Sequence, residues 1–183
     1  MADDATALKT DRLELRMLRP DDAVAITTLI QNWNVLRMLS SPPHPYGLAD
    51  AEGFIAHRLE IGNTPQDCVY AISIEDELVG VIGIEPNADG EPTLGYWLGE
   101  TYWDKGLMSD AAALLVHHYF AVSERDTLYC AAFCENPASI RIQEKVGFTR
   151  MGDTEIFSKP RNAMMKCIAT RLTRDEYRRQ RRQ

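Results

Sequence analysis

The chain of 183 residues contains no run of 18 apolar residues, so it has no segment suited to a membrane-spanning helix. Its start, Met1-Ala2-Asp3-Asp4, lacks the basic segment and the apolar run of a secretory signal peptide. The four cysteines show no Cys-x-x-Cys spacing, and a chain of this size needs no disulfide framework. We therefore predict a cytoplasmic protein without membrane contact, whose thiols are buried and unpaired.

The sequence also has fewer positively charged than negatively charged residues. The sequence has 20 Lys and Arg residues against 27 Asp and Glu residues, a net charge of −7. A surface of this sign repels phosphate backbones, which argues against nucleic acid and favours an amine-bearing partner. Arginines do gather at 173–183, where Thr173 and Glu176 fit a capping box. Because this helix is terminal and the rest of the chain is acidic, we predict an exposed basic tail, Arg182 included, rather than an RNA site.

Metal-ligating side chains are sparse as well. His117 and His118 have no further His, Cys or paired carboxylate at ligand spacing. Cys130 and Cys134 lie in a strand-like segment that separates them by about 13 Å, too far for one shared ion. The sequence thus predicts no metal site.

The length fits one domain, 1–183, with a core at 11–172. Apolar residues that alternate predict strands, and apolar residues at three- and four-residue spacing predict helices. Three prolines between Ser41 and Gly47 predict a stiff surface loop. The predicted strands are 13–17, 69–74, 78–84, 93–98, 127–134, 154–157 and 163–172. The predicted helices begin near Pro20, Asn32, Ala49, Gly106, Pro137 and Thr173.

A strand, a glycine-containing loop and a helix follow one another between Leu94 and Tyr119. The strand contains Gly95-Tyr96-Trp97-Leu98-Gly99, and the loop reads Trp103-Asp104-Lys105-Gly106-Leu107-Met108-Ser109. The start of a helix presents backbone N–H groups without intrahelical partners at the positive end of the helix dipole. Such a start is suited to a phosphate or pyrophosphate. The loop has too few glycines for a P-loop or a dinucleotide motif, so an ordinary capped helix is the alternative.

A second motif, Asn136-Pro137-Ala138-Ser139, precedes a short helix that ends Glu144-Lys145-Val146-Gly147-Phe148. With both motifs in this order, the chain resembles the GNAT superfamily of N-acetyltransferases, and most closely its RimJ/RimL-like branch. The likeness extends from Arg12-Leu13 through His44-Pro45-Tyr46 to about Gly152. The matching residues are Gly95-Tyr96-Trp97-Leu98, Tyr102-Trp103, Lys105-Gly106, Asn136, Ser139, Lys145 and Gly147-Phe148.

The resemblance implies an α/β (α+β) fold with a mixed, largely antiparallel sheet of about seven strands flanked by helices. The sheet would splay between its fourth and fifth strands, with acetyl-CoA in the gap. Open strand edges suit pairing with the pantetheine amides. Asp104 stands where the family usually has Gly, and Met108 where it has Gly or Ala, so we expect Asp104 to face solvent and Met108 to narrow the site. The residues implied to contact acetyl-CoA are Trp97, Leu98, Trp103, Asp104, Lys105, Gly106, Leu107, Met108, Ser109, Asn136, Ser139 and Lys145.

The family reaction is direct attack of a neutral amine on the thioester in a ternary complex. The resemblance implies Ser139 as the general acid toward the thiolate; the alternative is a serine that only satisfies the helix start. Glu155 is near the place where the branch can carry a basic carboxylate, and the alternatives are His44, Glu85, Glu100 or a chain of waters.

The acceptor expected from this resemblance is a primary amine, on a protein N-terminus or a small metabolite. A coenzyme A-binding module that has lost catalysis and serves regulation or assembly is the alternative. The loops that select the acceptor follow no pattern that identifies it, and the oligomeric state, a homodimer included, stays open.

Overall fold

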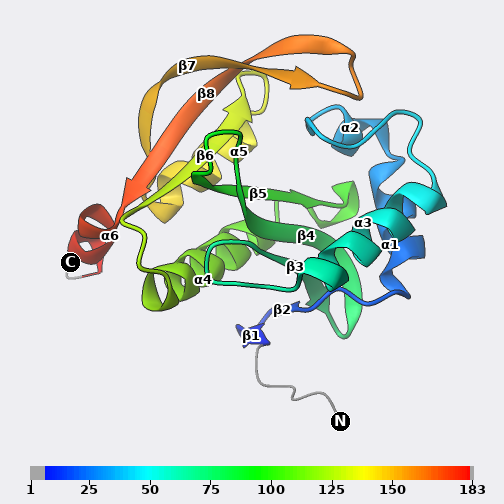
Figure 1. Ribbon diagram of the computed structural model, residues 1–183, viewed down its shortest axis with the longest axis horizontal. Coiled ribbons are helices and arrows are strands. Elements are labelled where there is room, and N and C mark those ends of the chain that lie inside the picture. Colours follow the sequence, from blue (N-terminus) through cyan, green and yellow to red (C-terminus); the bar gives the residue numbers. More distant parts are fainter. Residues whose placement is uncertain (1–6, 182–183) are drawn as a thin grey trace.

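The computed structural model describes residues 7–181. Its strands are β1 (Leu8–Lys9), β2 (Glu14–Arg16), β3 (Cys68–Ile74), β4 (Glu77–Pro86), β5 (Pro92–Leu98), β6 (Thr127–Phe133), β7 (Thr149–Ser158) and β8 (Ala163–Thr173). Its helices are α1 (Asp22–Ile30), α2 (Trp33–Leu36), α3 (Leu48–Ile61), the 3-10 turn η1 (Glu100–Tyr102), α4 (Leu107–Val122), α5 (Pro137–Val146) and α6 (Arg174–Gln180). The strands form one sheet in the order β1-β2-β3-β4-β5-β6-β8-β7 (Figure 1).

Neighbouring strands of this sheet are antiparallel, except that β5 and β6 are parallel. The β5–β6 pairing comprises Thr93 with Tyr129 and Leu94 with Cys130. Beyond these pairs the two strands diverge (Figure 1). The mixed, largely antiparallel sheet is therefore confirmed, and so is its splay. The fourth and fifth predicted strands are β5 and β6 because the short β1 was not predicted.

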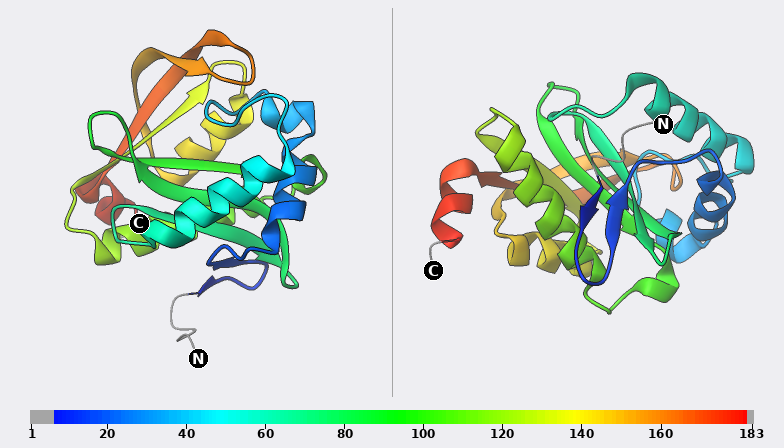
Figure 2. Two further views of the ribbon diagram at one scale, coloured as in Figure 1. Left: turned by 45° about the vertical axis from the view of Figure 1, so that its right-hand side comes forward. Right: turned by 90° about the horizontal axis from the view of Figure 1, so that it is seen from below.

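Helices cover both faces of the sheet (Figure 2). On one face α4 buries Ala111 and Leu115 against Ile72, Ile82 and other strand residues. On the opposite face α1 and α3 pack over an apolar cluster that includes Val69 and Val81. Because β3 and β4 are covered on both sides, they read as continuous apolar runs rather than as alternating ones.

A buried ion pair fixes the start of α1. The Arg16 guanidinium donates two hydrogen bonds to the Asp22 carboxylate, at 2.9 and 2.8 Å, and both residues are at most 6% exposed. Asp22 also accepts from the Arg19 backbone N–H at 2.7 Å. The hydrogen bond to Asp22 raises the pKa of Arg16. The Asp22 carboxylate thus links the start of α1 to β2.

The prediction for β7 was too short. The sequence indicated a strand at 154–157, whereas β7 pairs with β8 from Thr149 to Ser158. Most side chains of β7 are exposed, and its sequence therefore does not alternate between apolar and polar residues. Pairing with β8 extends the strand over residues whose own sequence does not predict a strand.

The C-terminal helix α6 begins with the predicted capping box between Thr173 and Glu176. Arg174 is half-buried, because its guanidinium donates to the carbonyl oxygens of Phe120 and Ser123 at the end of α4, both at 2.6 Å. The prediction of an exposed tail was therefore wrong for Arg174, and Arg182 lies outside the described residues.

All four cysteines are free, as expected, but Cys134 is exposed because it follows the end of β6 rather than lying within it. No helix in the described part of the chain is long and apolar enough to cross a bilayer.

Candidate active site

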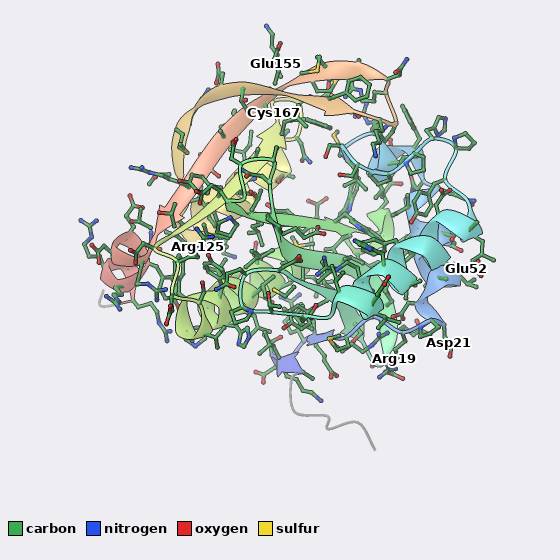
Figure 3. The ribbon with its side chains drawn as sticks, viewed as in Figure 1. Arg19, Asp21, Glu52, Arg125, Glu155 and Cys167 are labelled. Carbon is green, nitrogen blue, oxygen red and sulfur yellow. The ribbon has the colours of Figure 1, made fainter. Side chains whose placement is uncertain are left out.

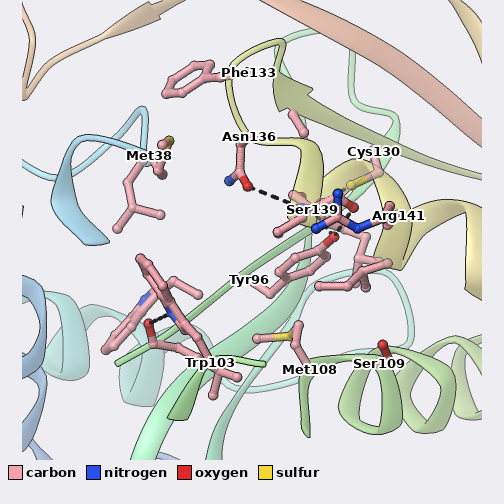
Figure 4. A pocket seen from close by; sticks show the side chains of 18 of the residues that line it. Met38, Tyr96, Trp103, Met108, Ser109, Cys130, Phe133, Asn136, Ser139 and Arg141 are labelled. Carbon is pink, nitrogen blue, oxygen red and sulfur yellow. Dashed lines mark hydrogen bonds between the residues drawn. The ribbon is translucent and has the colours of Figure 1, made fainter. Parts of the chain in front are cut away.

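The divergence of β5 and β6 opens a cleft of about 440 Å³, shown in Figure 4. Residues 94–98 of β5 form one wall, and residues 130–133 of β6 form the opposite one. One edge of β5 pairs with β4 as far as Leu98. The other edge faces the cleft without a strand partner among the described residues once β6 has diverged. There the Leu98 carbonyl accepts a 2.9 Å hydrogen bond from the Trp103 indole N–H.

The first turn of α4 closes one end of this cleft. Gly106 precedes the helix in a left-handed conformation, with φ of 77°. Leu107 and Met108 are only 6% exposed, and their side chains anchor the turn in the apolar cluster under the sheet. Since the first N–H groups of a helix have no intrahelical acceptor, this turn presents them at the positive end of the α4 dipole. Such a turn is suited to an anion, and phosphate binding by this loop stays a prediction.

The second motif lies across the cleft, at the start of α5. The side-chain oxygen of Asn136 caps this helix by accepting a 3.2 Å hydrogen bond from the Ser139 backbone N–H. The NH2 group of Asn136 is turned away from the helix (Figure 4). It is thus available to a carbonyl group of a ligand.

The Ser139 hydroxyl lies between β5 and α5. Its oxygen is 3.0 Å from the Tyr96 hydroxyl oxygen (Figure 4). It also accepts from the Gln143 amide at 3.3 Å. Tyr96 also donates to the Ser139 carbonyl at 3.2 Å. Burial raises the pKa of Tyr96 well above its ordinary value, so this phenol stays protonated at neutral pH. Ser139 is thus held by neutral hydrogen-bonding groups.

A second cleft, of about 370 Å³, lies on the α1 and α3 face of the sheet. Its floor includes Gly83 and Gly95, which are paired across β4 and β5. A Cβ atom added at Gly95 would meet nothing within 4 Å apart from its chain neighbours, so this part of the floor is open. Leu39, Ser40, Gly95, Tyr96 and Trp97 line both clefts, which therefore meet at β5.

The family model described as an acetyltransferase (GNAT) domain matches residues 12–149. This chain belongs to the GNAT acetyltransferase family. It is 36% identical over 88 residues to the ribosomal-protein-serine acetyltransferase of Escherichia coli (strain K12), in an alignment that covers 46% of this chain and 48% of that relative. The chain thus matches about half the length of that relative.

A second relative is matched over nearly all of its length. This is the SPbeta prophage-derived uncharacterized N-acetyltransferase YokL of Bacillus subtilis (strain 168), which is 24% identical over 169 residues, covering 91% of this chain and 93% of YokL. Among solved structures, RimL, a ribosomal L7/L12 alpha-N-protein acetyltransferase in complex with coenzyme A, has a TM-score of 0.79 at 18% identity, covering 92% of this chain and 98% of RimL. The predicted resemblance to RimJ/RimL-like GNAT enzymes is therefore confirmed.

The cleft of this GNAT enzyme gathers nearly all the residues expected to contact acetyl-CoA. Lys105 is the exception: its ammonium group lies 5.6 Å from the centre of the Tyr102 ring, and its side chain does not line the cleft. Asp104 is exposed, as expected, yet lies at the cleft wall. The expected residues that line the cleft are Trp97, Leu98, Trp103, Asp104, Gly106, Leu107, Met108, Ser109, Asn136, Ser139 and Lys145.

Arg141 also lines the cleft, one helical turn before Lys145, although it was not among the predicted residues. The spacing of four residues places both cations on one side of α5. That spacing is visible in the sequence and would have indicated a basic edge next to the predicted anion site.

The candidate bases lie apart from one another. Glu155 is exposed on β7 and points outward from the sheet (Figure 3), away from both clefts. The Glu100 carboxylate accepts hydrogen bonds from the side-chain amides of Asn32 and Asn34. His44 is exposed and packs against the Trp33 ring, with 5.1 Å between ring centres. The structure therefore does not bring Glu155 together with Ser139.

Glu85 is the candidate base that lines the second cleft. Its carboxylate lies 3.3 Å from the guanidinium of the buried Arg58. The Glu85 side chain is 54% exposed. Partial desolvation raises its pKa, and the positive charge of Arg58 opposes that effect. Within residues 7–181, no group of three or more His, Cys, Asp or Glu side chains is arranged to hold a metal ion.

Proposed function

We propose that this GNAT enzyme transfers an acetyl group from acetyl-CoA to a primary amine, on a protein N-terminus or a small metabolite. The observation that carries the proposal is the meeting of two clefts at Tyr96 and Trp97, with Ser139 in the first cleft and Glu85 in the second. An acyl donor in the first cleft and an amine in the second would then approach each other across β5.

The residues of the first cleft fit acetyl-CoA. The N–H groups at the start of α4 suit its diphosphate, and Arg141 and Lys145 place positive charge on the facing helix. The free edge of β5 and the NH2 group of Asn136 suit the amides of the pantetheine arm. RimL, which shares the fold, is solved in complex with coenzyme A. Asp104 alone is mismatched, because its carboxylate repels phosphate.

The second cleft suits a cationic acceptor with apolar parts. Its charged residues are Asp50 and Glu85, with no Lys, Arg or His among the residues that line it. Phe54, Tyr46 and Trp97 supply aromatic walls. Neutralising a lysine-type amine of pKa about 10.4 at pH 7 requires about 4.6 kcal/mol, whereas an α-amine of pKa about 7.8 requires about 1 kcal/mol. An α-amine is therefore the favoured acceptor.

The chemistry follows from this placement. The lone pair of the neutral amine forms the new C–N bond at the thioester carbonyl, and the C–S bond breaks with its electron pair on sulfur. Ser139 gives its hydroxyl proton to that sulfur. The proton lost from nitrogen passes through a water molecule to the base, and Ser139 recovers a proton from solvent.

For the base we propose Glu85, acting through water, in place of Glu155. Glu85 lies two residues along β4 from Gly83, the strand partner of Gly95 at the junction of the clefts. The upward shift brings the pKa of Glu85 closer to the pKa of the amine, which favours proton transfer between them. A cytoplasmic site of action stays a prediction from the sequence.

The test is release of the coenzyme thiol from acetyl-CoA across a panel of N-terminal peptides, polyamines, amino acids and aminoglycosides. We expect turnover with α-amines at pH 7, and a fall in kcat of about 100-fold in Ser139→Ala with little change in the KM for acetyl-CoA. A fall of less than about threefold would contradict the acid role, since general acids supply far more.

The alternative function, a non-catalytic coenzyme A-binding module, gives a different result in the same assay. It predicts no thiol release with any amine, while coenzyme A still raises the unfolding temperature through its binding to the folded state. Asp104 and Met108, which depart from the family pattern at the phosphate loop, are the observations in its favour.

A further inference from the structure

The amide of Gln143 is buried beside the proposed acid. Gln143 is 1% exposed and is the one residue of α5 that is buried. A primary amide transferred from water into a protein interior is destabilising unless its donors and acceptor are hydrogen-bonded. An apolar side chain at this position would fill the space without that requirement, so the amide needs an explanation in terms of its partners.

Those partners form a chain that ends at Ser139. The Thr170 hydroxyl, itself 2% exposed on β8, donates to the Gln143 amide oxygen at 2.7 Å. The Gln143 NH2 group donates to the Ser139 hydroxyl oxygen at 3.3 Å. The chain thus runs from a buried strand residue to the side chain that lines the acetyl-CoA cleft.

The amide of Gln143 has a defined orientation. Its oxygen lies on the β8 side, where it accepts from the Thr170 hydroxyl at 2.7 Å, and its NH2 group lies on the Ser139 side. The Thr170 hydroxyl oxygen is also 3.3 Å from the Cys130 carbonyl oxygen, a longer contact than the one to Gln143. The Ser139 oxygen then accepts, and its own hydrogen is free to point to Tyr96 or into the cleft. With the amide reversed, Ser139 would donate to Gln143 and its hydrogen would be occupied.

We propose that Gln143, oriented by Thr170, is a positioning residue that keeps the Ser139 hydroxyl a proton donor toward the cleft. The inference rests on the acid role proposed for Ser139. When Ser139 gives its proton to sulfur, negative charge develops on its oxygen. An N–H donor aimed at that oxygen in a buried site stabilises the charge, and so makes the hydroxyl a stronger acid in the transition state.

The first test compares Gln143→Met, which keeps the side-chain volume but removes the amide, with the wild-type enzyme. We expect kcat to fall about tenfold, as the loss of one hydrogen bond to a developing charge predicts, with the KM for acetyl-CoA within about twofold. Acetyl transfer is followed in single turnovers, so that product release does not mask the step. A merely structural role would alter stability and both kinetic parameters without this split.

Thr170 supplies a second, independent test. Thr170→Val keeps the shape but removes the hydroxyl that orients the amide, and we expect kcat to fall about fivefold. Thr170→Ser restores the hydroxyl and should bring kcat back to within about twofold of wild type. Thr149→Val is the control, because the exposed Thr149 hydroxyl on β7 donates to the Arg171 carbonyl and is not a member of the chain that ends at Ser139, so kcat should not change.

A double-mutant cycle separates this inference from the proposed function. If Gln143 acts through Ser139, then Ser139→Ala combined with Gln143→Met should be no slower than Ser139→Ala alone. Additive losses, or an unchanged kcat in Gln143→Met beside a large loss in Ser139→Ala, would overturn the positioning role and leave the acid role intact. An unchanged kcat in Ser139→Ala would overturn both. Should Gln143→Met fail to unfold cooperatively, Thr170→Val in the same cycle decides by the same criteria.

Discussion

The Arg12 guanidinium, from the segment before β2, donates a 2.8 Å hydrogen bond to the Asp110 carboxylate in the first turn of α4. The same guanidinium donates to the Lys105 carbonyl in the loop that precedes the helix. Arg12 thus holds two points on either side of Gly106, the residue that begins the proposed diphosphate site. These groups are 98 and 93 residues away from Arg12 along the chain.

Arg12→Ala should weaken coenzyme A binding by releasing this loop. We expect the dissociation constant to rise about fivefold, the effect of losing about one charged hydrogen bond, with kcat changed less. Because the pair is 48% and 33% exposed, the free energy of unfolding should fall by less than about 1 kcal/mol. Titration calorimetry checks the first value and urea unfolding the second. Lys9→Ala, which breaks the exposed pair with Glu14, is the control and should leave coenzyme A affinity unchanged.

Asp104→Asn should strengthen coenzyme A binding. Asp104 has a left-handed φ of 58° at the wall of the first cleft, and Asn adopts that conformation equally well. Removing the charge removes its repulsion of phosphate, so we expect the dissociation constant to fall about threefold at about 0.05 M salt and less at about 0.5 M. Asp89→Asn, in the exposed β4–β5 turn, is the matched control. Equal or weaker binding by Asp104→Asn would indicate that this carboxylate does not face the diphosphate.

The conformations of the loop proposed to bind phosphate and of the α5 start were predictable because each is encoded locally. A positive φ at Gly106 and a side-chain cap at Asn136 depend on residues within a few positions along the chain. The orientation of the Glu155 side chain relative to the first cleft was not predictable in this way. Ile156 lines the first cleft, and since successive strand residues face opposite sides, Glu155 points away from it. That choice is made by the register of β7 against β8, which the sequence of β7 does not contain.

The second cleft and the buried hydrogen-bond chain could not be predicted from the sequence for a similar reason. Gly83 meets Gly95 only through the register of β4 against β5, and Thr170 meets Gln143 across 27 residues. Gln143 in a helix reads as an ordinary exposed residue, because α5 is mostly polar. Its burial follows from the packing of α5 on the sheet.

Two glycine substitutions should have opposite effects on stability. Gly106→Ala places a side chain at a φ of 77°, which costs about 1 to 2 kcal/mol and disturbs the phosphate loop. Gly53→Ala lies in the exposed middle of α3, where a new methyl group meets nothing within 4 Å, and should stabilise the fold by about 0.5 to 1 kcal/mol. Urea unfolding measures both. Only Gly106→Ala should also weaken coenzyme A binding, and a loss of affinity in Gly53→Ala would contradict the site.

Alkylation should distinguish Cys134 from the other three cysteines. Burial raises the pKa of Cys68 and of Cys167 to about 11 and that of Cys130 to about 12, so all three are protonated thiols at pH 8. Because the thiolate is the nucleophile, the native protein should take up one carbamidomethyl group from iodoacetamide, at the exposed Cys134. Peptide mass mapping locates the adduct. Cys134→Ser should take up none, and protein unfolded in guanidinium should react at all four. Rapid labelling of Cys167 at pH 8 would show that the base of the first cleft is open to solvent.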